Sequence, residues 1–593
     1  MDVAVCGRHY GELGQWPKKH KMSEATDIGP TMLLTAENHC FKVMKGLQSL
    51  RKNSVLCDYS LVAEGEVINV HKAVLAACSD YFHVMLTGSM RESREGLVEL
   101  KGVSCTGLQV VVDFAYSGVL ELNSDNVEEV LAAATHLQVT DAVELCSRYL
   151  EAAITIENCV DILNLTELYS LEHTREETRK FILERFEVFA ESEHYYKLTS
   201  TQMASLLSEN CLRVMSEYRL FELVLKWIAF DKANREACVA DLMRNVRLPL
   251  LSGEELVDKV SRVPIMKQNP DCVDLLTDAK DYHIVVSKQA LLQTWRTQVR
   301  SDRTSLVMCN ADNLESYTLE TKRYAFLKDC TIPLYNPCVV VVDNFMYACG
   351  GKYDSNDNNE IATARCFRYD PRFDSWFELP SMNEARKDFV VVVHNRKLYA
   401  IAGQDENMVM CTMECFSITE NEWEKKASQP QAVFSHAGAL CNGRIYISGG
   451  QKFTGCCNQL SCYDPESDLW EDKEPMLNAR CNHSMAEVAN KLYITGGNIE
   501  DGYGFAVPVI SIETYCPISN QWTLCKRTLN IREAGSCVVG NKIYIVGGIN
   551  GEHYYSDLVQ SYNPLDDTIC VIEKFPTRIY CKACCILTLP QYV

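Results

Sequence analysis

The sequence contains no long apolar run, no basic run suited to following a phosphate backbone and no segment typical of secretion. No apolar stretch approaches the roughly 18 residues of a membrane-spanning helix, so no membrane association is expected. The formal net charge of −21 argues against nucleic acid as a partner. Lysines and histidines interrupt the amino terminus, so a signal peptide is not expected, and the cytoplasm is the predicted location, with the nucleus as the alternative. In that setting the 29 cysteines are predicted to be reduced thiols.

The short motifs of common enzymes are also missing. The sequence has no P-loop, no HExxH, no GxSxG and no glycine-rich dinucleotide turn, so no catalytic residue and no cofactor is predicted. Two cysteine groups lack a second ligand pair for a metal, and buried inert thiols are favoured over a redox sensor: Cys581, Cys584 and Cys585, and Cys456, Cys457 and Cys462.

The second half of the chain repeats one phrase, which is clearest between Gly443 and Trp470. An apolar run that favours a strand ends at Gly449-Gly450, and a Tyr-Asp-Pro turn signal follows at Tyr463. Seven residues after that tyrosine comes Trp470. The same spacing of seven recurs, with intervals of 52, 47, 47, 52 and 47 residues, at Tyr324, Trp376, Trp423, Trp470, Trp522 and Ile569. Six copies in register predict an array of one supersecondary unit.

A glycine pair, Tyr-Asp-Pro and a tryptophan at about 50 residues per unit resemble the kelch repeat. The resemblance implies a β-propeller of four-stranded blades, here with six blades. The first copy, from Leu306, has no innermost strand before it, while Ala583 to Leu589 follows the last copy as an extra strand. We therefore expect this carboxyl-terminal strand to complete the first blade and close the ring, which leaves no open sheet edge.

The first half begins with a polar, aperiodic stretch, residues 1–36, which is predicted to be a flexible arm. An amphipathic helix is then expected, with an apolar stripe of Phe41, Met44, Leu47 and Leu50. Short strands and helices alternate after it, through Cys57-Asp58, the His71 to Phe82 run and Phe114-Ala115-Tyr116-Ser117-Gly118.

That succession resembles a BTB domain over residues 37–150, a family in which the first helix packs across a homodimer interface. The stripe of Phe41, Met44, Leu47 and Leu50 is therefore the predicted dimer interface, with packing on its own subunit as the alternative. Residues 151–285 are helix-compatible throughout and resemble the all-helical BACK domain. Residues 286–303 are predicted to link it to the propeller of residues 304–593. The expected fold is thus an α/β BTB domain, an all-α BACK domain and an all-β propeller.

The order BTB, BACK, kelch resembles the kelch-like family, whose members are substrate adaptors of cullin-RING ubiquitin ligases. The resemblance implies a homodimer that binds the third cullin through its BTB and BACK domains and a protein substrate through its propeller. The cullin-binding signature corresponds to Met90-Arg91-Glu92, with Met90 and Glu92 as the contacts and an ordinary solvated loop as the alternative. Tyr81 and Tyr116 are expected to frame the same surface, or else to lie in the core.

On the propeller, an arginine follows three of the tryptophans by ten residues: Arg386, Arg480 and Arg532. The resemblance implies acidic or polar peptide ligands near the propeller axis, and converging guanidinium groups would hold carboxylates by paired hydrogen bonds. Pairing with acidic neighbours of the next blade is the alternative. Phe434, Ser435 and His436 stand where one copy departs from this pattern, and Phe434 and His436 join the predicted substrate-binding residues.

Loop lengths give a second indication of a ligand site. The segments Lys352 to Ala362 and Asn498 to Pro508 are longer than their counterparts, and the second carries Tyr503, which is also predicted to bind substrate. Two other functions stay open. The first is a cytoskeletal scaffold with actin as its partner. The second is a copper oxidase, which is disfavoured because no set of Tyr, His and Cys ligands can be assigned.

Overall fold

The structure is a computed structural model, which describes residues 36, 38–88, 91–309, 313–330, 334–354, 360–500, 505–575 and 583–591. The arm predicted for residues 1–36 lies almost wholly outside the described residues. The chain divides into two compact units, Met1–Leu150 and Glu151–Val593. In the described parts of the chain, no helix has the length and apolar character needed to cross a bilayer.

The first unit is a small α/β domain around a three-stranded sheet of order β2-β1-β3. Strand β1 pairs antiparallel with β2 and parallel with β3, and Leu61 and Ala63 on β1 are completely buried. The predicted alternation of strands and helices is confirmed, in the order α1 (His39–Lys52), β1 (Tyr59–Ala63), β2 (Glu66–Val70), α2 (Lys72–Cys78), α3 (Asp80–Thr87), α4 (Glu92–Glu95), β3 (Leu97–Glu99), α5 (Cys105–Ser117), α6 (Val127–His136) and α7 (Thr140–Ala152).

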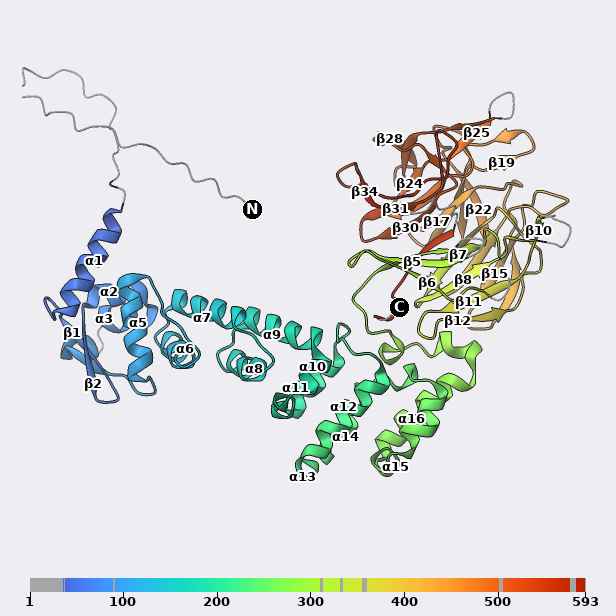
Figure 1. The fold of residues 1–593 in the computed structure, drawn as a ribbon. Coiled ribbons are helices and arrows are strands. Elements are labelled where there is room, and N and C mark those ends of the chain that lie inside the picture. Colours follow the sequence, from blue (N-terminus) through green and yellow to red (C-terminus); the bar gives the residue numbers. More distant parts are fainter. Residues whose placement is uncertain are drawn as a thin grey trace, which may run out of the picture. The chain divides into compact units, whose positions relative to one another are not determined.

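The second unit begins with helices that pack on one apolar core. Trp227, on the most amphipathic helix of this stretch, is 1% exposed and lies in the middle of that core. The helices follow one another along the chain (Figure 1): α8 (Cys159–Leu168), α9 (Glu172–Glu184), α10 (Phe186–Ala190), α11 (Ser200–Ser208), α12 (Glu217–Phe230), α13 (Lys232–Arg235), α14 (Val239–Arg244), α15 (Pro264–Gln268) and α16 (Pro270–Ile284).

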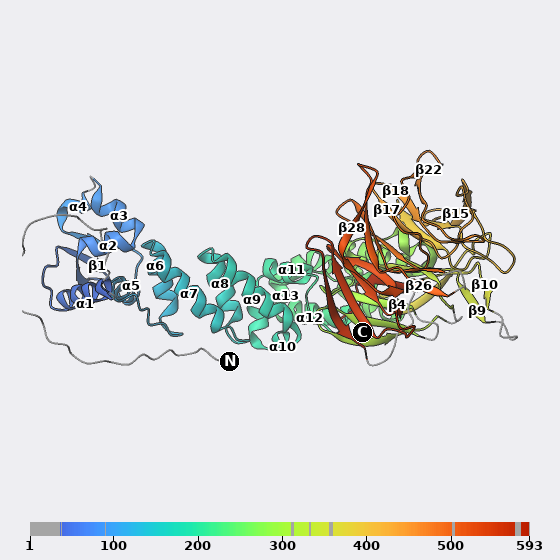
Figure 2. The same cartoon turned by 90° about the horizontal axis from the view of Figure 1, so that it is seen from above.

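Six four-stranded antiparallel sheets complete the second unit within the described residues, and Figure 2 shows them from a second side. Their strands, from the innermost outward, are β35 (Ala583–Leu587), β4 (Ser305–Cys309), β5 (Leu314–Thr318) and β6 (Arg323–Leu327); β7 (Cys338–Val342), β8 (Phe345–Cys349), β11 (Cys366–Asp370) and β12 (Ser375–Leu379); β13 (Val390–His394), β14 (Lys397–Ile401), β15 (Met413–Ser417) and β16 (Glu422–Lys426); β17 (Ala437–Cys441), β18 (Arg444–Ser448), β21 (Leu460–Asp464) and β22 (Leu469–Lys473); β23 (Ser484–Val488), β24 (Lys491–Thr495), β27 (Ser511–Cys516) and β28 (Gln521–Thr528); and β30 (Gly535–Val539), β31 (Lys542–Val546), β33 (Leu558–Asn563) and β34 (Thr568–Lys574).

The ring closes as the sequence predicts. Strand β35, from the carboxyl terminus, pairs antiparallel with β4 from Ala583 opposite Cys309 to Leu587 opposite Ser305. The first blade therefore takes its innermost strand from the end of the chain, and opening the ring would expose a complete row of backbone hydrogen-bonding groups.

The spacing of seven between aromatic residues is the register of the outer hairpin of each blade. Tyr463 on β21 lies directly opposite Trp470 on β22, and the other five copies pair in the same way. Each of the four tryptophans donates its indole N–H to a backbone carbonyl of the preceding blade at 2.7–2.9 Å. The repeated tryptophan thus joins neighbouring blades as well as filling the core.

The glycine pair after the second strand allows close contact between blades. Gly449 and Gly450 have φ of 57° and 98°, and a Cβ on Gly449 would lie 2.4 Å from the carbonyl oxygen of Arg480. Both longer loops form hairpins instead of open loops: β9 (Lys352–Asp354) with β10 (Glu360–Ala362), and β25 (Asn498–Glu500) with β26 (Ala506–Pro508). Similar short pairs are β19 (Gln451–Lys452) with β20 (Gly455–Cys456), and β29 (Ile531–Arg532) with β32 (Ile549–Asn550).

Candidate functional site

One end of the propeller channel opens into a cavity of about 250 Å³ to which all six innermost strands contribute. Its rim consists of one polar residue from each of five blades, two residues before the inner strand. We call these residues the mouth ring: Asn336, Asp388, Ser435, Asn482 and Glu533. The position that would complete the ring in the first blade, Cys581, lies outside the described residues.

The mouth ring has an unusual and repeated backbone geometry. All five residues have positive φ, between 51° and 55°. The backbone N–H of Ser435 donates to the carbonyl of Asp388 at 2.7 Å, that of Asn482 to Ser435 at 2.9 Å, and that of Glu533 to Asn482 at 3.0 Å. Asparagine and aspartate tolerate the left-handed region better than most residues, which fits the composition of the ring. These three bonds join four consecutive blades, the third to the sixth, along the cavity.

Two buried histidines line the cavity behind the rim. His436 is 7% exposed, and burial lowers its pKa to about 4. The Nε2 atom of His483 lies 2.8 Å from Ser448 Oγ, and burial, followed by the nearby Arg480, lowers the pKa of His483 as well. Both imidazoles are consequently neutral at pH 7.

Two of the three predicted arginines do not reach the cavity. Arg386 and Arg480 are 0% exposed, and each forms an ion pair with a buried glutamate of the blade that follows, Glu414 and Glu513. Arg386 also donates to the carbonyls of Ala402 and Thr412, at 2.9 Å each. The predicted surface of converging arginines is therefore wrong, and the alternative of acidic partners in the next blade describes what is found.

Arg532 lies one residue out of register with the other two. The backbone N–H groups of Gly351, Gly450 and Gly497 each donate to the carbonyl of a residue that stands two positions before a member of the mouth ring. For Gly497 the accepting residue is Ile531, two positions before Glu533. Ile531 is thus the buried counterpart of Arg480, whereas Arg532 is half-buried and its Nη2 lies 3.3 Å from His553 Nδ1. Arg532 remains beside the cavity because it precedes Glu533.

Of the other predicted substrate-binding residues, one lines the cavity and one does not. His436 lines the cavity, while the half-buried Phe434 pairs with Gln451 beside it and does not line it. Tyr503 lies outside the described residues. Sequence reasoning missed the mouth ring, although a shift of two residues from Arg386 and Arg480 would have found Asp388 and Asn482.

In the first unit, the predicted partner surface lies around α3 and α4. Tyr81 is half-buried and packs against His136, with ring centroids 5.8 Å apart, and Glu92 begins α4. Met90 lies outside the described residues. Tyr116 is 2% exposed and its hydroxyl accepts a hydrogen bond from the backbone N–H of His71 at 2.8 Å, so it belongs to the core and does not frame this surface.

Helix α1 leaves part of its apolar stripe uncovered. Phe41 is 63% exposed, while Met44, Leu47 and Leu50 are half-buried. The end of the helix is held on its own domain because the buried Arg51 forms an ion pair with Asp113 on α5. The exposed portion is therefore the first turns of the helix, away from that anchor.

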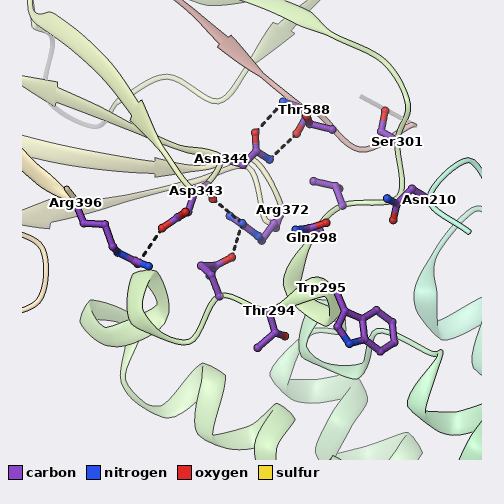
Figure 3. Close-up of a pocket in the computed structure, with 12 residues that line it drawn as sticks. Asn210, Thr294, Trp295, Gln298, Ser301, Asp343, Asn344, Arg372, Arg396 and Thr588 are labelled. Atoms are coloured by element: carbon purple, nitrogen blue, oxygen red, sulfur yellow. Dashed lines mark hydrogen bonds and ion pairs between the residues drawn. The ribbon is translucent and has the colours of Figure 1, made fainter. Parts of the chain in front are cut away.

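A second cavity, of about 570 Å³, lies where the linker meets the propeller (Figure 3). Arg372 crosses it and donates to the carbonyl of Thr297 at 2.6 Å, to Gln293 Oε1 at 2.7 Å and to the carbonyl of Asp343 at 3.0 Å. Arg396 pairs with Asp343 Oδ2 at 2.9 Å. The arginines in this cavity are bound to the protein itself, so we assign the cavity to the joint between linker and propeller.

Comparison with known proteins matches each part of the chain to a family model. The BTB/POZ domain matches residues 47–154, "BTB And C-terminal Kelch" matches 159–261, the KLHDC2/KLHL20/DRC7 Kelch-repeats domain matches 336–528 and the Kelch motif matches 532–568.

Full-length relatives give the same result. Kelch-like protein 26 of Danio rerio is 34% identical over 574 residues, covering 94% of each chain. Kelch-like protein 26 of Homo sapiens is 35% identical over 595 aligned positions, covering 98% of this chain and 97% of the relative. Kelch-like protein 31 of Homo sapiens is 37% identical over 573 residues, covering 94% and 90%. With these domains in this order and relatives along nearly its whole length, the chain belongs to the kelch-like family of BTB–BACK–kelch proteins.

Proposed function

We propose that this chain is a substrate adaptor of a cullin-RING ubiquitin ligase, in which the BTB and BACK domains bind the third cullin and the propeller binds a protein substrate. The observation that carries the proposal is the mouth cavity, a polar site to which every blade contributes and which is separate from the α/β domain. Family membership supports the cullin partner. An adaptor needs two independent binding surfaces, and a chain that combines BTB and BACK domains with a propeller supports this role.

The lining of the mouth cavity favours cationic or amide-bearing substrate segments over acidic ones. Asp388 and Glu533 contribute carboxylates, Asn336 and Asn482 contribute amides, and the described lining residues include no lysine or arginine. Asp388 is held in place because Gln404 Nε2 donates to its Oδ2 at 3.0 Å. A cavity of about 250 Å³ accommodates one or two side chains of a docked segment, so the rest of that segment would lie on the surrounding hairpins.

For the cullin surface we propose the exposed face of α3 together with the start of α4. Val84 on α3 is 57% exposed, and Tyr81 and Glu92, which begins α4, are half-buried. Apolar side chains beside a carboxylate form a surface of the kind that protein interfaces use, with an apolar centre and a polar rim. Tyr59 donates its hydroxyl to the carbonyl of Glu92 at 2.9 Å, which fixes the start of α4.

The proposed adaptor is a homodimer formed through α1. Phe41 and Val43 are 63% and 48% exposed, a large apolar area for the first turns of one helix. A second copy of the helix would bury this area, and closed twofold symmetry is the commonest arrangement of such self-association. Two propellers per complex would increase avidity for substrates with two binding segments.

Copurification tests the cullin partner. Tagged full-length protein expressed in human cells is expected to retain the third cullin, and Glu92→Ala and Met90→Ala are each expected to reduce its recovery about tenfold, the effect of losing about 1.4 kcal/mol of binding free energy. Glu66→Ala is the matched control, because it removes an exposed carboxylate from β2, at the opposite edge of the sheet from β3. Equal cullin recovery from all variants would refute the proposed surface.

Proximity labelling tests the substrate site. Asp388→Arg and Glu533→Arg reverse the charge of the mouth ring and are expected to remove substrates from the labelled set while the third cullin stays. Glu466→Arg, in the exposed turn between β21 and β22, makes the same charge change outside the cavity. If the mouth variants lose no partner, the substrate binds elsewhere. Cosedimentation of the protein with actin filaments, without cullin recovery, would favour the scaffold function instead.

A further inference from the structure

Two cysteines from different blades meet beside the mouth ring. Cys456 lies on β20, where it pairs with Gln451 across a short hairpin, and Cys481 precedes the first strand of the fifth blade. The two sulfur atoms are 3.3 Å apart, closer than the 3.8 Å between Cys537 and Cys584. Both thiols are free in this structure.

The backbone around both cysteines fixes this approach. Cys481 exchanges two backbone hydrogen bonds with Asn498, at 2.9 and 3.0 Å, and both sulfur atoms lie near the carbonyl of Asn498, at 3.7 Å from Cys456 and 3.5 Å from Cys481. The register of two hairpins therefore brings the sulfur atoms together. A disulfide of about 2 Å requires a further approach of little more than 1 Å, which side-chain rotation can supply.

The two thiols differ in acidity and exposure. Their shared hydrogen bond lowers the pKa of Cys456 to about 7, and the same bond, with burial, raises the pKa of Cys481. Cys456 is half-buried and accessible from the surface, while Cys481 is 1% exposed. This combination gives one thiolate that an oxidant can reach and one protected thiol within reach of it.

We propose that Cys456 and Cys481 form a peroxide-oxidisable dithiol that closes to a disulfide between the fourth and fifth blades. The Cys456 thiolate attacks hydrogen peroxide, so that an S–O bond forms, the O–O bond breaks and the released hydroxide takes up a proton to become water. Cys481 then attacks the sulfenic sulfur of Cys456, the S–S bond forms, and the S–O bond breaks. The released hydroxide takes the Cys481 proton as a second water molecule.

The position of the dithiol gives the oxidation a consequence. Cys481 immediately precedes Asn482 of the mouth ring, and the Asn482 side chain donates to Asn498 Oδ1 at 3.2 Å. A disulfide would add a covalent bond between hairpin β19–β20 and the chain one residue from the cavity rim. The proposal concerns the thiols themselves and does not depend on the function proposed above.

Peptide mapping of the full chain tests the proposal. Reduced protein at pH 7 is treated with hydrogen peroxide, its remaining thiols are alkylated, and a tryptic digest is analysed without reduction. The expected product links residues 453–473 to residues 481–491, and Cys481 is the only cysteine in the second peptide. Fragmentation must place the bond on Cys456 and not on Cys457 or Cys462. The link is expected at peroxide concentrations that leave the Cys537–Cys584 pair reduced.

Three variants complete the experiment. In Cys481→Ser, peroxide should leave a sulfenic acid on Cys456 that dimedone traps, whereas Cys456→Ser should form no link and no trapped sulfenic acid at Cys481. Cys457→Ser is the matched control and should form the link at the wild-type rate. A linked peptide that persists in Cys456→Ser, or the failure of any link to form in the wild type before other cysteines oxidise, overturns the proposal.

Discussion

Removing the buried Arg480 guanidinium should destabilise the propeller strongly, because it leaves a buried carboxylate without its ion-pair partner. Arg480 donates to the carbonyls of Gly496 and Ser511 at 3.0 and 2.8 Å, to Ser511 Oγ at 2.9 Å, and to Glu513. Glu513 is 0% exposed and, among the described residues, would keep the donors of Leu477 and Asn478, at 2.8 Å each. Breaking a pair of this kind costs about 3–5 kcal/mol.

The expected change in melting temperature follows from the size of the propeller. About 290 residues at ~2.1 cal/mol/K per residue give an unfolding entropy of about 0.6 kcal/mol/K, so Arg480→Ala should lower the propeller Tm by about 5–8 °C. Intrinsic tryptophan fluorescence reports the transition, because four of the seven tryptophans join neighbouring blades. Differential scanning calorimetry separates the propeller transition from the helical and BTB transitions.

The chain itself supplies the compensating variant. In the fourth blade the same two positions are occupied by Val433 and Ser461, so Arg480→Val with Glu513→Ser reproduces an arrangement that this propeller already contains. The double variant should recover to within about 1–2 kcal/mol of the wild type, because removing both charges leaves no isolated carboxylate. A Tm loss below about 2 °C for Arg480→Ala, or a double variant less stable than the single one, would refute the reasoning.

Three further predictions concern the mouth cavity, helix α1 and the dithiol. In the folded protein the pKa of His436 is about 4, below the usual value of about 6.5. The unfolded state therefore takes up this proton at a higher pH, and the free energy of unfolding falls as the pH drops from about 6.5 to 4. At pH 5 the loss is about 2 kcal/mol. His436→Phe places at this position the residue type that Phe389 provides in the preceding blade. The variant should lose about 3 °C less in Tm between pH 7 and pH 5 than the wild type. An unchanged pH dependence of Tm would count against a buried neutral imidazole. Phe41→Glu should convert a dimer into a monomer in light scattering, whereas Val67→Glu, an exposed apolar position on β2, should not; equal masses would exclude α1 as the interface. The rate of Cys456 alkylation by iodoacetamide should be half-maximal near pH 7, while the adjacent Cys457, whose pKa burial raises, should react only at higher pH. A midpoint near 8.5 for Cys456 would contradict the shared hydrogen bond.

The fold could be predicted because its signals are local and repeated. The spacing of seven between Tyr463 and Trp470 is a hairpin register, so reading it six times gave the blade count and the phase of each blade. The closing strand could be predicted because the first copy has no inner strand before it, while one extra strand follows the last copy. Helix α1 could be predicted because its apolar residues have helical spacing, although that spacing does not reveal which of these side chains are exposed.

The candidate site was harder to predict because adjacent residues in one loop face opposite environments. Arg480 and Asn482 are two residues apart, yet the first is completely buried and the second lies on the rim of the cavity. The ten-residue spacing after the tryptophans and the family resemblance suggested that the arginines bind ligand, and only the position of Glu513 reveals that Arg480 is used inside the blade. Ile531, and not Arg532, occupies the position in the sixth blade that Arg480 occupies in the fifth. The sequence does not show this shift of one residue, because it depends on the backbone hydrogen bonds that the preceding glycine pair donates.

The position two residues before each mouth-ring residue is buried and is filled differently in different blades. Where Arg386 or Arg480 fills this position, a glutamate faces it from the third strand; where Leu334 fills it, Phe367 does, and the two pack in one apolar cluster. The second, third and fifth blades thus fill this position with a matched pair, either ionic or apolar, whereas the fourth blade has Val433 and Ser461. The backbone bonds donated by Ser435, Asn482 and Glu533 involve no side chain of the mouth ring, so the rim side chains can differ among residues that tolerate a positive φ. Substitutions of the rim should therefore alter binding with little effect on stability, while substitutions two residues earlier should do the reverse.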